Sequence, residues 1–302
     1  MKAKFLDCND DLGGVFDKVF RPGQDFPVEV NRQARITPEE LPRLLDGYAI
    51  AIDDHSYIPT DWAKKCPSLK HVVFLGTGAA SYMNIAELKA LGIAVHIIKG
   101  YGDTAVAEHA FALMWAAARQ IPLQDRRLRA GTWAPLPGPQ LTGKSLGLVG
   151  LGGIGAEMAR LCAGMGMKVQ AWNRSPKEMT GVKMVELDTL LATSDVVSVH
   201  LLLSDETRGI LSAEKIAKLK DGAIVVNTAR GALFDEPALV AALQSGRISA
   251  GLDVFEKEPL APDHPLTQLD NVVITAHSAF RTPEASETLI CRALDIVNRL
   301  AE

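Results

Sequence analysis

Arginine, glutamate and histidine side chains follow three short apolar runs in the last third of this 302-residue chain. Arg230 lies in the sequence NTARG, Glu258 in DVFEKEP and His277 in TAHS. An imidazole exchanges protons near neutral pH, and a carboxylate beside it orients the ring and favours its protonated form. A guanidinium can hold a carboxylate through two parallel hydrogen bonds. Each residue alone fits a surface or packing role, but together they could bind an anionic small molecule and exchange a proton with it.

The apolar runs before these motifs predict strands of one buried parallel sheet. Continuous apolar runs are typical of parallel strands that are covered on both faces. In open sheets of this kind, ligands bind beyond the carboxyl ends of the strands, so we expect the three motifs to lie at one edge. Strands are expected at residues 145–149, 167–172, 182–185, 195–201, 223–227, 250–254 and 272–275.

A glycine turn follows the first of these strands. The run GLVGLGGIG contains Gly150, Gly152 and Gly155 in a G-x-G-x-x-G pattern, with Gly153 and Ile154 between the last two, and a helical run comes next. A strand, a glycine turn and a helix in that order are what the pyrophosphate of a dinucleotide requires. The phosphates would contact the unpaired N–H groups at the start of the helix. The alternative is a glycine-rich turn that binds no ligand.

The second strand of this unit is followed by Asn173, Arg174 and Ser175. Dinucleotide folds often carry a carboxylate here, about 20 residues after the glycines, which accepts a hydrogen bond from the 2′-hydroxyl of the adenine ribose. This chain has an uncharged Asn173, eighteen residues after Gly155, and a fixed cation at Arg174. An arginine binds a 2′-phosphate through charge-assisted hydrogen bonds. We therefore expect these residues to favour NADP(H), with NAD(H) as the alternative; Arg174 could instead be solvated or stack on adenine.

A bound nicotinamide would give the Arg230, Glu258 and His277 motifs a reaction. Hydride reduction of a ketone requires an acid that protonates the oxygen, and histidine serves best near neutral pH. His277 is therefore the candidate acid–base, Glu258 its orienting carboxylate and Arg230 the residue that binds a substrate carboxylate.

The first hundred residues predict a second parallel sheet. Short apolar runs alternate with helical ones, which implies a sheet covered on both faces. Gly76, Thr77 and Gly78 follow one of these strands, and their backbone N–H groups could hold an anion, although a plain β-turn fits the composition equally. Strands are expected at residues 3–6, 28–30, 48–52, 71–75 and 95–98, and helices at 42–45, 61–65, 84–90 and, at the end of the chain, 283–300.

Two segments connect these regions. Residues 103–120 predict a helix with apolar side chains on several faces, buried nearly all round. Residues 121–143 are rich in Pro, Gly and Arg and are expected to form an arm or a long surface connection. Within them, Arg126, Arg127 and Arg129 fit the solvated carboxyl end of a helix, where cations complement the helix dipole.

Composition and charge narrow the class of protein. The chain is 47% apolar and 23% charged with a net charge of −4, which is ordinary for a globular protein and predicts neither a nucleic-acid nor an anionic-membrane partner. Its four cysteines form no C-x-x-C and no zinc pattern, so we expect reduced thiols, a cytoplasmic protein and no metal site. The N-terminus turns acidic within its first residues, so we do not expect a signal peptide there. The longest apolar helical stretch, residues 110–118, is too short for a membrane span.

A set of motifs, taken together, resembles the D-isomer-specific 2-hydroxyacid dehydrogenase family, in particular its glyoxylate and hydroxypyruvate reductases. The resemblance is weak up to about Ile98 and strong from Tyr101 to His277, and no single motif would suffice for it. The motifs are VAEH at residues 106–109, the GLVGLGGIG run, His200 with Glu206-Thr207-Arg208-Gly209, NTARG, GLDVFEKEPL, His264-Pro265-Leu266 and NVVITAH.

The resemblance implies a role for each matching residue. Arg230 corresponds to the family's substrate-binding arginine, Glu258 to the glutamate that pairs with a histidine, and His277 to the acid–base. Asp253 corresponds to the aspartate near the nicotinamide amide. The resemblance also implies that the loop Gly76-Thr77-Gly78 binds the substrate carboxylate, and that Thr104, His200 and Thr228 contact the cofactor.

The resemblance further implies an α/β protein with two Rossmann-like or flavodoxin-like lobes. A doubly wound NAD(P)-binding lobe, residues 100–278, would be inserted in a substrate-binding lobe formed by residues 1–99 and 279–302. The protein would be a homodimer that transfers hydride between nicotinamide and the α-carbon of a small 2-keto acid.

Some positions depart from the family pattern. Ala276 stands where a proline usually precedes the histidine, three leucines at 201–203 replace a small or proline-containing run, and residues 79–84 match the family loop only loosely. These departures concern substrate identity more than reaction type. A phosphoglycerate dehydrogenase-like enzyme and a nucleotide-sensing corepressor-like binding protein remain as alternatives, whereas formate dehydrogenase chemistry is disfavoured because that related family lacks the glutamate that Glu258 supplies.

Overall fold

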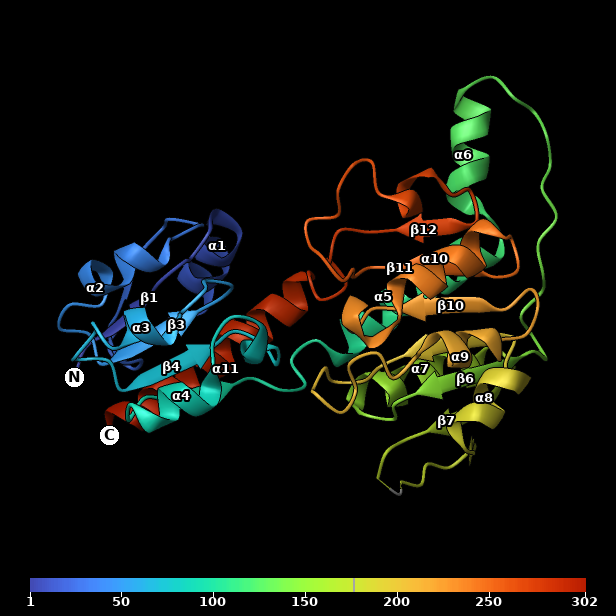
Figure 1. Cartoon of the computed structure of the whole chain (residues 1–302). Coiled ribbons are helices and arrows are strands. Elements are labelled where there is room, and N and C mark those ends of the chain that lie inside the picture. The colour runs from blue at the N-terminus through green and yellow to red at the C-terminus, as the bar shows by residue number, and fades with distance from the viewer. Residues whose placement is uncertain (176) are drawn as a thin grey trace. The chain divides into compact units, whose positions relative to one another are not determined.

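The chain forms two compact units, which are described here separately. The computed structural model describes residues 1–175 and 177–302. Unit 1 comprises Met1–Gly102 and Arg281–Glu302, and unit 2 comprises the uninterrupted stretch Asp103–Phe280 (Figure 1). Unit 2 is thus an insertion in the sequence of unit 1.

Unit 1 is built on a five-stranded parallel sheet in the order β2-β1-β3-β4-β5. This is the flavodoxin-like strand order. The strands are β1 (Ala3–Phe5), β2 (Val28–Val30), β3 (Ile50–Asp53), β4 (His71–Phe74) and β5 (Ala94–Ile97), and the helices are α1 (Asp10–Val19), α2 (Leu41–Leu44), α3 (Thr60–Ala63), α4 (Ile85–Ala90) and α11 (Pro283–Ala301).

Two apolar clusters cover the two faces of this sheet. On one face α1 and α11 pack against β1 and β3, with Phe16, Ile290 and Leu294 among the buried side chains. On the other face α2, α3 and α4 contribute Leu41, Leu88 and their neighbours. The last helix of the chain therefore completes a core that begins with the first strand.

Unit 2 is built on a seven-stranded parallel sheet in the order β12-β11-β10-β9-β6-β7-β8. The order reverses between β6 and β9, which is the arrangement of a doubly wound dinucleotide fold. The strands are β6 (Ser145–Val149), β7 (Lys168–Trp172), β8 (Val182–Met184), β9 (Val196–Val199), β10 (Ile224–Asn227), β11 (Ser249–Leu252) and β12 (Val272–Ile274), and the helices are α5 (Asp103–Ala118), α6 (Ile121–Arg129), α7 (Gly153–Gly164), α8 (Leu187–Thr193), α9 (Ala213–Ala217) and α10 (Glu236–Gln244).

Helices α5 and α7 pack on one face of this sheet, and α8, α9 and α10 pack on the other. Gly251 of β11 lets α5 lie directly on the sheet, because a Cβ atom there would be 2.8 Å from the Cβ of Leu113. The expected α/β class with two doubly wound parallel sheets is confirmed.

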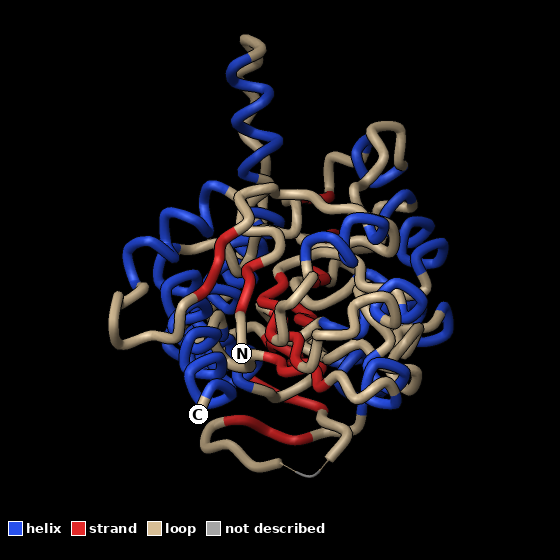
Figure 2. Tube along the Cα trace, turned by 90° about the vertical axis from the view of Figure 1, so that its left-hand side faces the viewer, coloured by secondary structure: helices blue, strands red, loops and turns tan. Residues whose placement is uncertain are grey.

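Two segments differ from the sequence expectation. Helix α1 was not predicted, because Gly13 and Gly14 lower its intrinsic helix propensity; the helix is stabilised by packing against α11. The segment expected to be an arm begins with the regular helix α6, whose Pro122 is compatible with a first helical turn. Helix α6 projects from unit 2 (Figures 1 and 2).

The basic cluster of α6 forms the last helical turn, as predicted. Arg126 and Arg127 pair with Asp270, and Arg129 pairs with Asp125. Across the two described stretches of the chain, no helix has the length and apolar character needed to cross a bilayer.

Candidate active site and dinucleotide site

The imidazole of His277 and the carboxylate of Glu258 form a hydrogen-bonded pair in unit 2. His277 Nδ1 lies 2.7 Å from Glu258 Oε2, and the two side chains are 27% and 35% exposed, so both can meet a ligand. His277 follows β12 in a left-handed conformation with φ of +48°, which side-chain-bearing residues rarely adopt. Such strained positions cluster at functional sites.

Glu258 is held as an ionised carboxylate. Burial raises its pKa, but the hydrogen bonds from His277 and from the Phe255 N–H, together with the charge of Arg230, outweigh burial and lower the pKa overall. Glu258 Oε1 accepts the Phe255 N–H at 3.0 Å, so both carboxylate oxygens have a donor. The pairing makes His277 Nδ1 the donor and leaves Nε2 for proton exchange.

Arg230 follows β10 and is placed beside the Glu258 loop by the glycine after it. A Cβ atom on Gly231 would lie 2.0 Å from the carbonyl carbon of Phe255, so only glycine allows the two backbones to approach this closely. Asn227 shapes the turn by donating to the Arg230 carbonyl at 2.9 Å. The structure thus brings Arg230, Glu258 and His277 together in one unit.

Asp253 anchors the loop that carries His277. Its side chain is fully buried, and its oxygens accept the Thr275 hydroxyl at 2.5 Å and the N–H groups of Ser278 and Ala279 at 2.9 Å. Burial raises the pKa of Asp253, but these hydrogen bonds and one from His109 lower it to about 2. A permanently ionised, saturated carboxylate therefore fixes the backbone on both sides of the histidine.

His109, to which the sequence motifs assigned no role in the site, belongs to this network. Its Nε2 lies 3.0 Å from Thr275 Oγ1 and 3.5 Å from Asp253 Oδ1. The VAEH motif was the signal in the sequence, but the partners of His109 are more than 140 residues away and could not be named from it.

The glycine turn has the shape that a pyrophosphate requires. Gly150 has φ of +102°, and a Cβ atom there would be 2.6 Å from the His200 carbonyl oxygen. A Cβ on Gly155 would be 2.3 Å from the Gly150 carbonyl oxygen, whereas a Cβ on Gly152 would meet no atom within 4 Å. The first and last glycines therefore permit close packing, and the middle one leaves open space at the start of α7.

Two buried polar atoms after the neighbouring strands β9 and β10 have no hydrogen-bond partner among the described residues. They are Nδ1 of His200, which follows β9, and Oγ1 of Thr228, which follows the adjacent strand β10. Burial lowers the pKa of His200 to about 4, so its ring is neutral, and its Nε2 lies 2.9 Å from Ser198 Oγ. Orphaned donors and acceptors at the carboxyl edge of the sheet fit a polar ligand such as a dinucleotide.

Asn173 holds the glycine turn. Its Oδ1 accepts the Leu151 N–H at 3.1 Å, and its Nδ2 donates to the Ser175 carbonyl at 2.8 Å. The ammonium of Lys177, which the sequence analysis missed, donates to the Leu151 carbonyl. Both backbone groups of Leu151 are therefore fixed by side chains from the loop after β7.

Arg174 and the remaining cofactor candidates are accessible. Arg174 is 66% exposed and pairs with Glu206, which lies after β9 and was not expected to take part. Thr104 is exposed in the first turn of α5, and Ile154 is half-buried in the first turn of α7. The carboxylate of Asp103 packs against Gly153, where a Cβ atom would be 1.8 Å from Asp103 Oδ2.

The loop Gly76-Thr77-Gly78 belongs to unit 1 and follows β4. Gly76 is buried with φ of +149°, its N–H donates to the Phe74 carbonyl at 2.9 Å, and its carbonyl accepts the Ile98 N–H at 2.9 Å. Thr77 is exposed, and Gly78 precedes a short 3-10 helix. Because the Gly76 N–H is already used, any anion would be bound by the N–H groups of Thr77 and Gly78.

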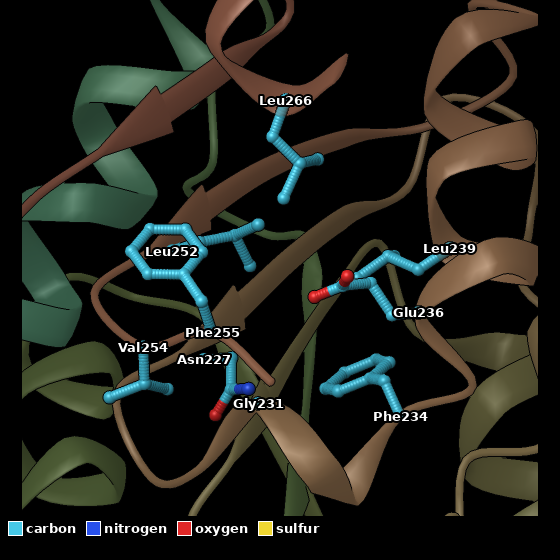
Figure 3. A pocket seen from close by; sticks show the side chains of 9 residues that line it. All are labelled: Asn227, Gly231, Phe234, Glu236, Leu239, Leu252, Val254, Phe255 and Leu266. Atoms are coloured by element: carbon cyan, nitrogen blue, oxygen red, sulfur yellow. The ribbon is translucent and has the colours of Figure 1, made fainter. Parts of the chain in front are cut away.

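A small pocket is lined in part by Gly231, next to Arg230, and by Val254 and Phe255 of the segment that leads to Glu258 (Figure 3). Glu236 at the start of α10 accepts the Glu256 N–H at 3.3 Å and lies 3.2 Å from His264 Nε2. These contacts hold α10 against the loop that carries Glu258, so residues around the pocket help to position that loop. It is lined by Asn227, Gly231, Phe234, Glu236, Leu239, Leu252, Val254, Phe255 and Leu266.

Known proteins share both the sequence and the architecture. The sequence model described as D-isomer specific 2-hydroxyacid dehydrogenase, NAD binding domain, matches residues 111–279. A D-3-phosphoglycerate dehydrogenase of Archaeoglobus fulgidus is 40% identical over 90% of this chain, but the match covers only 53% of that relative. A glycerate dehydrogenase of Methylorubrum extorquens is 34% identical over 90% of this chain and 89% of its own length.

A solved structure gives the same result for the fold. The acyclic imino acid reductase Bsp5, determined in complex with NADPH and D-Arg, has a TM-score of 0.87 and 30% identity, covering 100% of this chain and 97% of that one. Because the sequence model covers more than half of the chain and the glycerate dehydrogenase matches over nearly its whole length, the chain belongs to the D-isomer specific 2-hydroxyacid dehydrogenase family, whose members are NAD-dependent oxidoreductases acting on the CH–OH group of 2-hydroxy acids.

Proposed function

We propose that this protein reduces a small 2-keto acid, such as glyoxylate or hydroxypyruvate, to the 2-hydroxy acid and catalyses the reverse oxidation. The observation that carries the proposal is the His277–Glu258 pair beside Arg230. A reduced nicotinamide, when bound, would supply the hydride for the α-carbon. His277 Nε2 donates the proton that the carbonyl oxygen takes up, so the product carries one new C–H and one new O–H bond.

Each residue of the catalytic group has a distinct task. Arg230 binds the substrate carboxylate through its guanidinium. For unit 1, the proposal keeps the Gly76–Gly78 loop as an anion-binding loop that would act through the N–H groups of Thr77 and Gly78. Glu258 keeps His277 oriented and stabilises its protonated form before the transfer. In the reverse direction His277 accepts the proton, and Glu258 again compensates the charge that forms on the ring.

Unit 2 is the NAD(P)-binding domain, and unit 1 is the substrate-binding domain in this proposal. The turn from Gly150 to Gly155 would hold the pyrophosphate, because the backbone at Gly152 faces open space. The unpartnered atoms of His200 and Thr228 would gain partners in the cofactor. Asp253 would lie near the nicotinamide amide, and Thr104 would contact the cofactor from the first turn of α5.

NADP(H) is the proposed preferred cofactor, with NAD(H) as the weaker alternative. Arg174 is an exposed cation after the second strand of the dinucleotide fold, in a loop that also contains Asn173 and Ser175. An arginine at this place accommodates a 2′-phosphate. The similar imino acid reductase was determined with NADPH, which is consistent with this assignment.

A substrate panel tests the reaction. Purified protein would be mixed with glyoxylate, hydroxypyruvate or phosphohydroxypyruvate and with NADPH or NADH, and the loss of reduced nicotinamide would be followed. We expect turnover of an unphosphorylated 2-keto acid, faster with NADPH. Turnover of phosphohydroxypyruvate alone would favour a phosphoglycerate dehydrogenase, in line with the Archaeoglobus relative, and cofactor binding without any turnover would favour a nucleotide-sensing protein.

A homodimer is the proposed assembly. Helix α6 and the chain after it project from unit 2 (Figure 1). They carry the exposed apolar side chains of Ile121, Leu128 and Trp133, of which Trp133 is 85% exposed. Exposed apolar patches of this kind mark association surfaces. Sedimentation equilibrium should give twice the mass of the chain, and Trp133→Ser with Leu128→Ser should weaken the dimer; a wild-type monomer would refute the assignment.

A further inference from the structure

The exposed ion pair between Arg174 and Glu206 joins the two loops on either side of the glycine turn. Arg174 comes from the loop after β7 and Glu206 from the loop after β9, and the strand between them in the sheet is β6, which leads into the turn. The two side chains are 66% and 70% exposed, so neither is held there by burial. The pair therefore lies beside the place where a dinucleotide would enter.

The carboxamide of Asn173 is oriented by the glycine turn, because each of its ends makes one hydrogen bond there. Oδ1 accepts the Leu151 N–H and Nδ2 donates to the Ser175 carbonyl, so the side chain braces the turn. Lys177 is likewise bonded to the Leu151 carbonyl. Arg174 is an exposed cation of this loop that we place at the 2′-substituent of the adenine ribose, and its counter-ion is the carboxylate of Glu206.

We propose that Glu206 is a specificity-determining residue that limits the preference for a 2′-phosphorylated dinucleotide. A 2′-phosphate must displace Glu206 from Arg174 and then remain near a second negative charge, which lowers its affinity. A 2′-hydroxyl carries no charge and can donate a hydrogen bond to the same carboxylate. Glu206 therefore penalises NADPH and favours NADH, while Arg174 does the opposite.

This inference rests on the proposed function only in assuming that unit 2 binds a dinucleotide. It does not depend on which acid is reduced or on whether His277 is the acid–base. The part of the penalty that comes from displacing Glu206 exists only while Arg174 and Glu206 are both charged. The two substitutions should therefore be non-additive, which is a signature that a merely structural role for Glu206 would not produce.

The test uses adenine nucleotide fragments that contain no nicotinamide. Titration calorimetry on the full chain would compare adenosine 2′,5′-bisphosphate with AMP for the wild type, Glu206→Gln, Arg174→Gln and the double variant. Glu214→Gln is the matched control, because Glu214 is an exposed glutamate on α9 of unit 2 that pairs with Lys218 just after the helix, and its loss changes the net charge equally.

We expect Glu206→Gln to tighten adenosine 2′,5′-bisphosphate by roughly three- to tenfold and to leave AMP within about twofold. The gain should shrink in the Arg174→Gln background, and Glu214→Gln should change neither ligand. NADPH and NADH dissociation constants should follow the two fragments.

Several outcomes would overturn the inference. An unchanged ratio of the two fragments in Glu206→Gln, or an equal gain in Glu214→Gln, would show that Glu206 does not set specificity. Failure of both fragments to bind any variant would remove the dinucleotide site and this inference with it. Loss of the proposed reaction alone, with fragment binding as expected, would leave the inference standing and refute only the assigned substrate.

Discussion

His277 Nδ1 lies 2.7 Å from Glu258 Oε2, while the N–H of the same histidine donates to the Asp253 carbonyl at 2.8 Å. Side chain and backbone are thus fixed independently, and the ring can only present Nε2 to a ligand. A mobile imidazole would lose part of the advantage of a positioned acid. The first two predictions follow from this arrangement.

Replacing His277 should remove proton transfer and leave the cofactor site intact. His277→Ala is expected to lower kcat by about 10²- to 10⁴-fold, the contribution typical of a positioned acid or base. The NADPH dissociation constant should stay within about twofold, since the glycine turn is unaffected. His71→Asn, in unit 1 at the start of β4, is the matched control. Unchanged turnover in His277→Ala would refute the acid–base assignment.

Replacing Glu258 should move the pH dependence of reduction. Its carboxylate favours the protonated imidazole that the reduction needs, and a neutral amide does not. In Glu258→Gln, the alkaline limb of kcat is therefore expected to move to lower pH. The measurement is a pair of pH–rate profiles in identical buffers. A profile that keeps its midpoint and loses only amplitude would mean that Glu258 acts on geometry alone.

Substituting two glycines of the turn should have different effects, one on cofactor binding and the other on the stability of the protein. Gly152→Ala places a methyl group in open space, so the folded protein should keep its Tm, but cofactor binding should weaken by tenfold or more because the pyrophosphate needs that space. Gly155→Ala brings Cβ to 2.3 Å from the Gly150 carbonyl oxygen and should lower stability by about 1–3 kcal/mol. Thermal unfolding and calorimetry report the two effects; tight binding by Gly152→Ala would place the pyrophosphate elsewhere.

The neutral ring of His200 should make the protein acid-sensitive. Its pKa is about 4 in the folded state and 6.5 as a reference, so between these values the unfolded chain binds the extra proton. The free energy of unfolding should therefore fall as the pH drops from about 6.5 to 4, by at most about 3 kcal/mol. Denaturant titrations of the wild type and His200→Gln at several pH values test this. Parallel curves for the two proteins would contradict it.

The sheets were predictable because their strands carry a local signal. The run at Ser145–Val149 is buried on both faces, and its predicted and observed bounds agree. Helix α1 gave no such signal, because two glycines interrupt it and its stability comes from Phe16 packing in the core shared with α11. A local sequence pattern predicts a helix or a strand only where the residues of that pattern themselves stabilise it.

The residues of the candidate site could likewise be predicted only where a local motif contains them. Arg230, Glu258 and His277 stand in recognisable motifs, so their residue types could be read directly. The residues that orient or neutralise them come from distant parts of the chain: His109 meets Thr275 across 166 positions, and Glu206 meets Arg174 across 32. Nothing in a linear sequence pairs them, because the fold alone brings them within hydrogen-bond distance.

The return of the chain to unit 1 constrains how the protein is made on the ribosome. All seven strands of unit 2 are synthesised before α11, so the sheet of unit 2 is complete in the chain before the C-terminal helix exists. Unit 1 lacks part of its core until then, because Leu289, Ile290 and Leu294 belong to the same apolar cluster as Phe5. Before α11 is synthesised, α1 is the helix available to cover that face of the five-stranded sheet, so unit 1 is begun first and completed last.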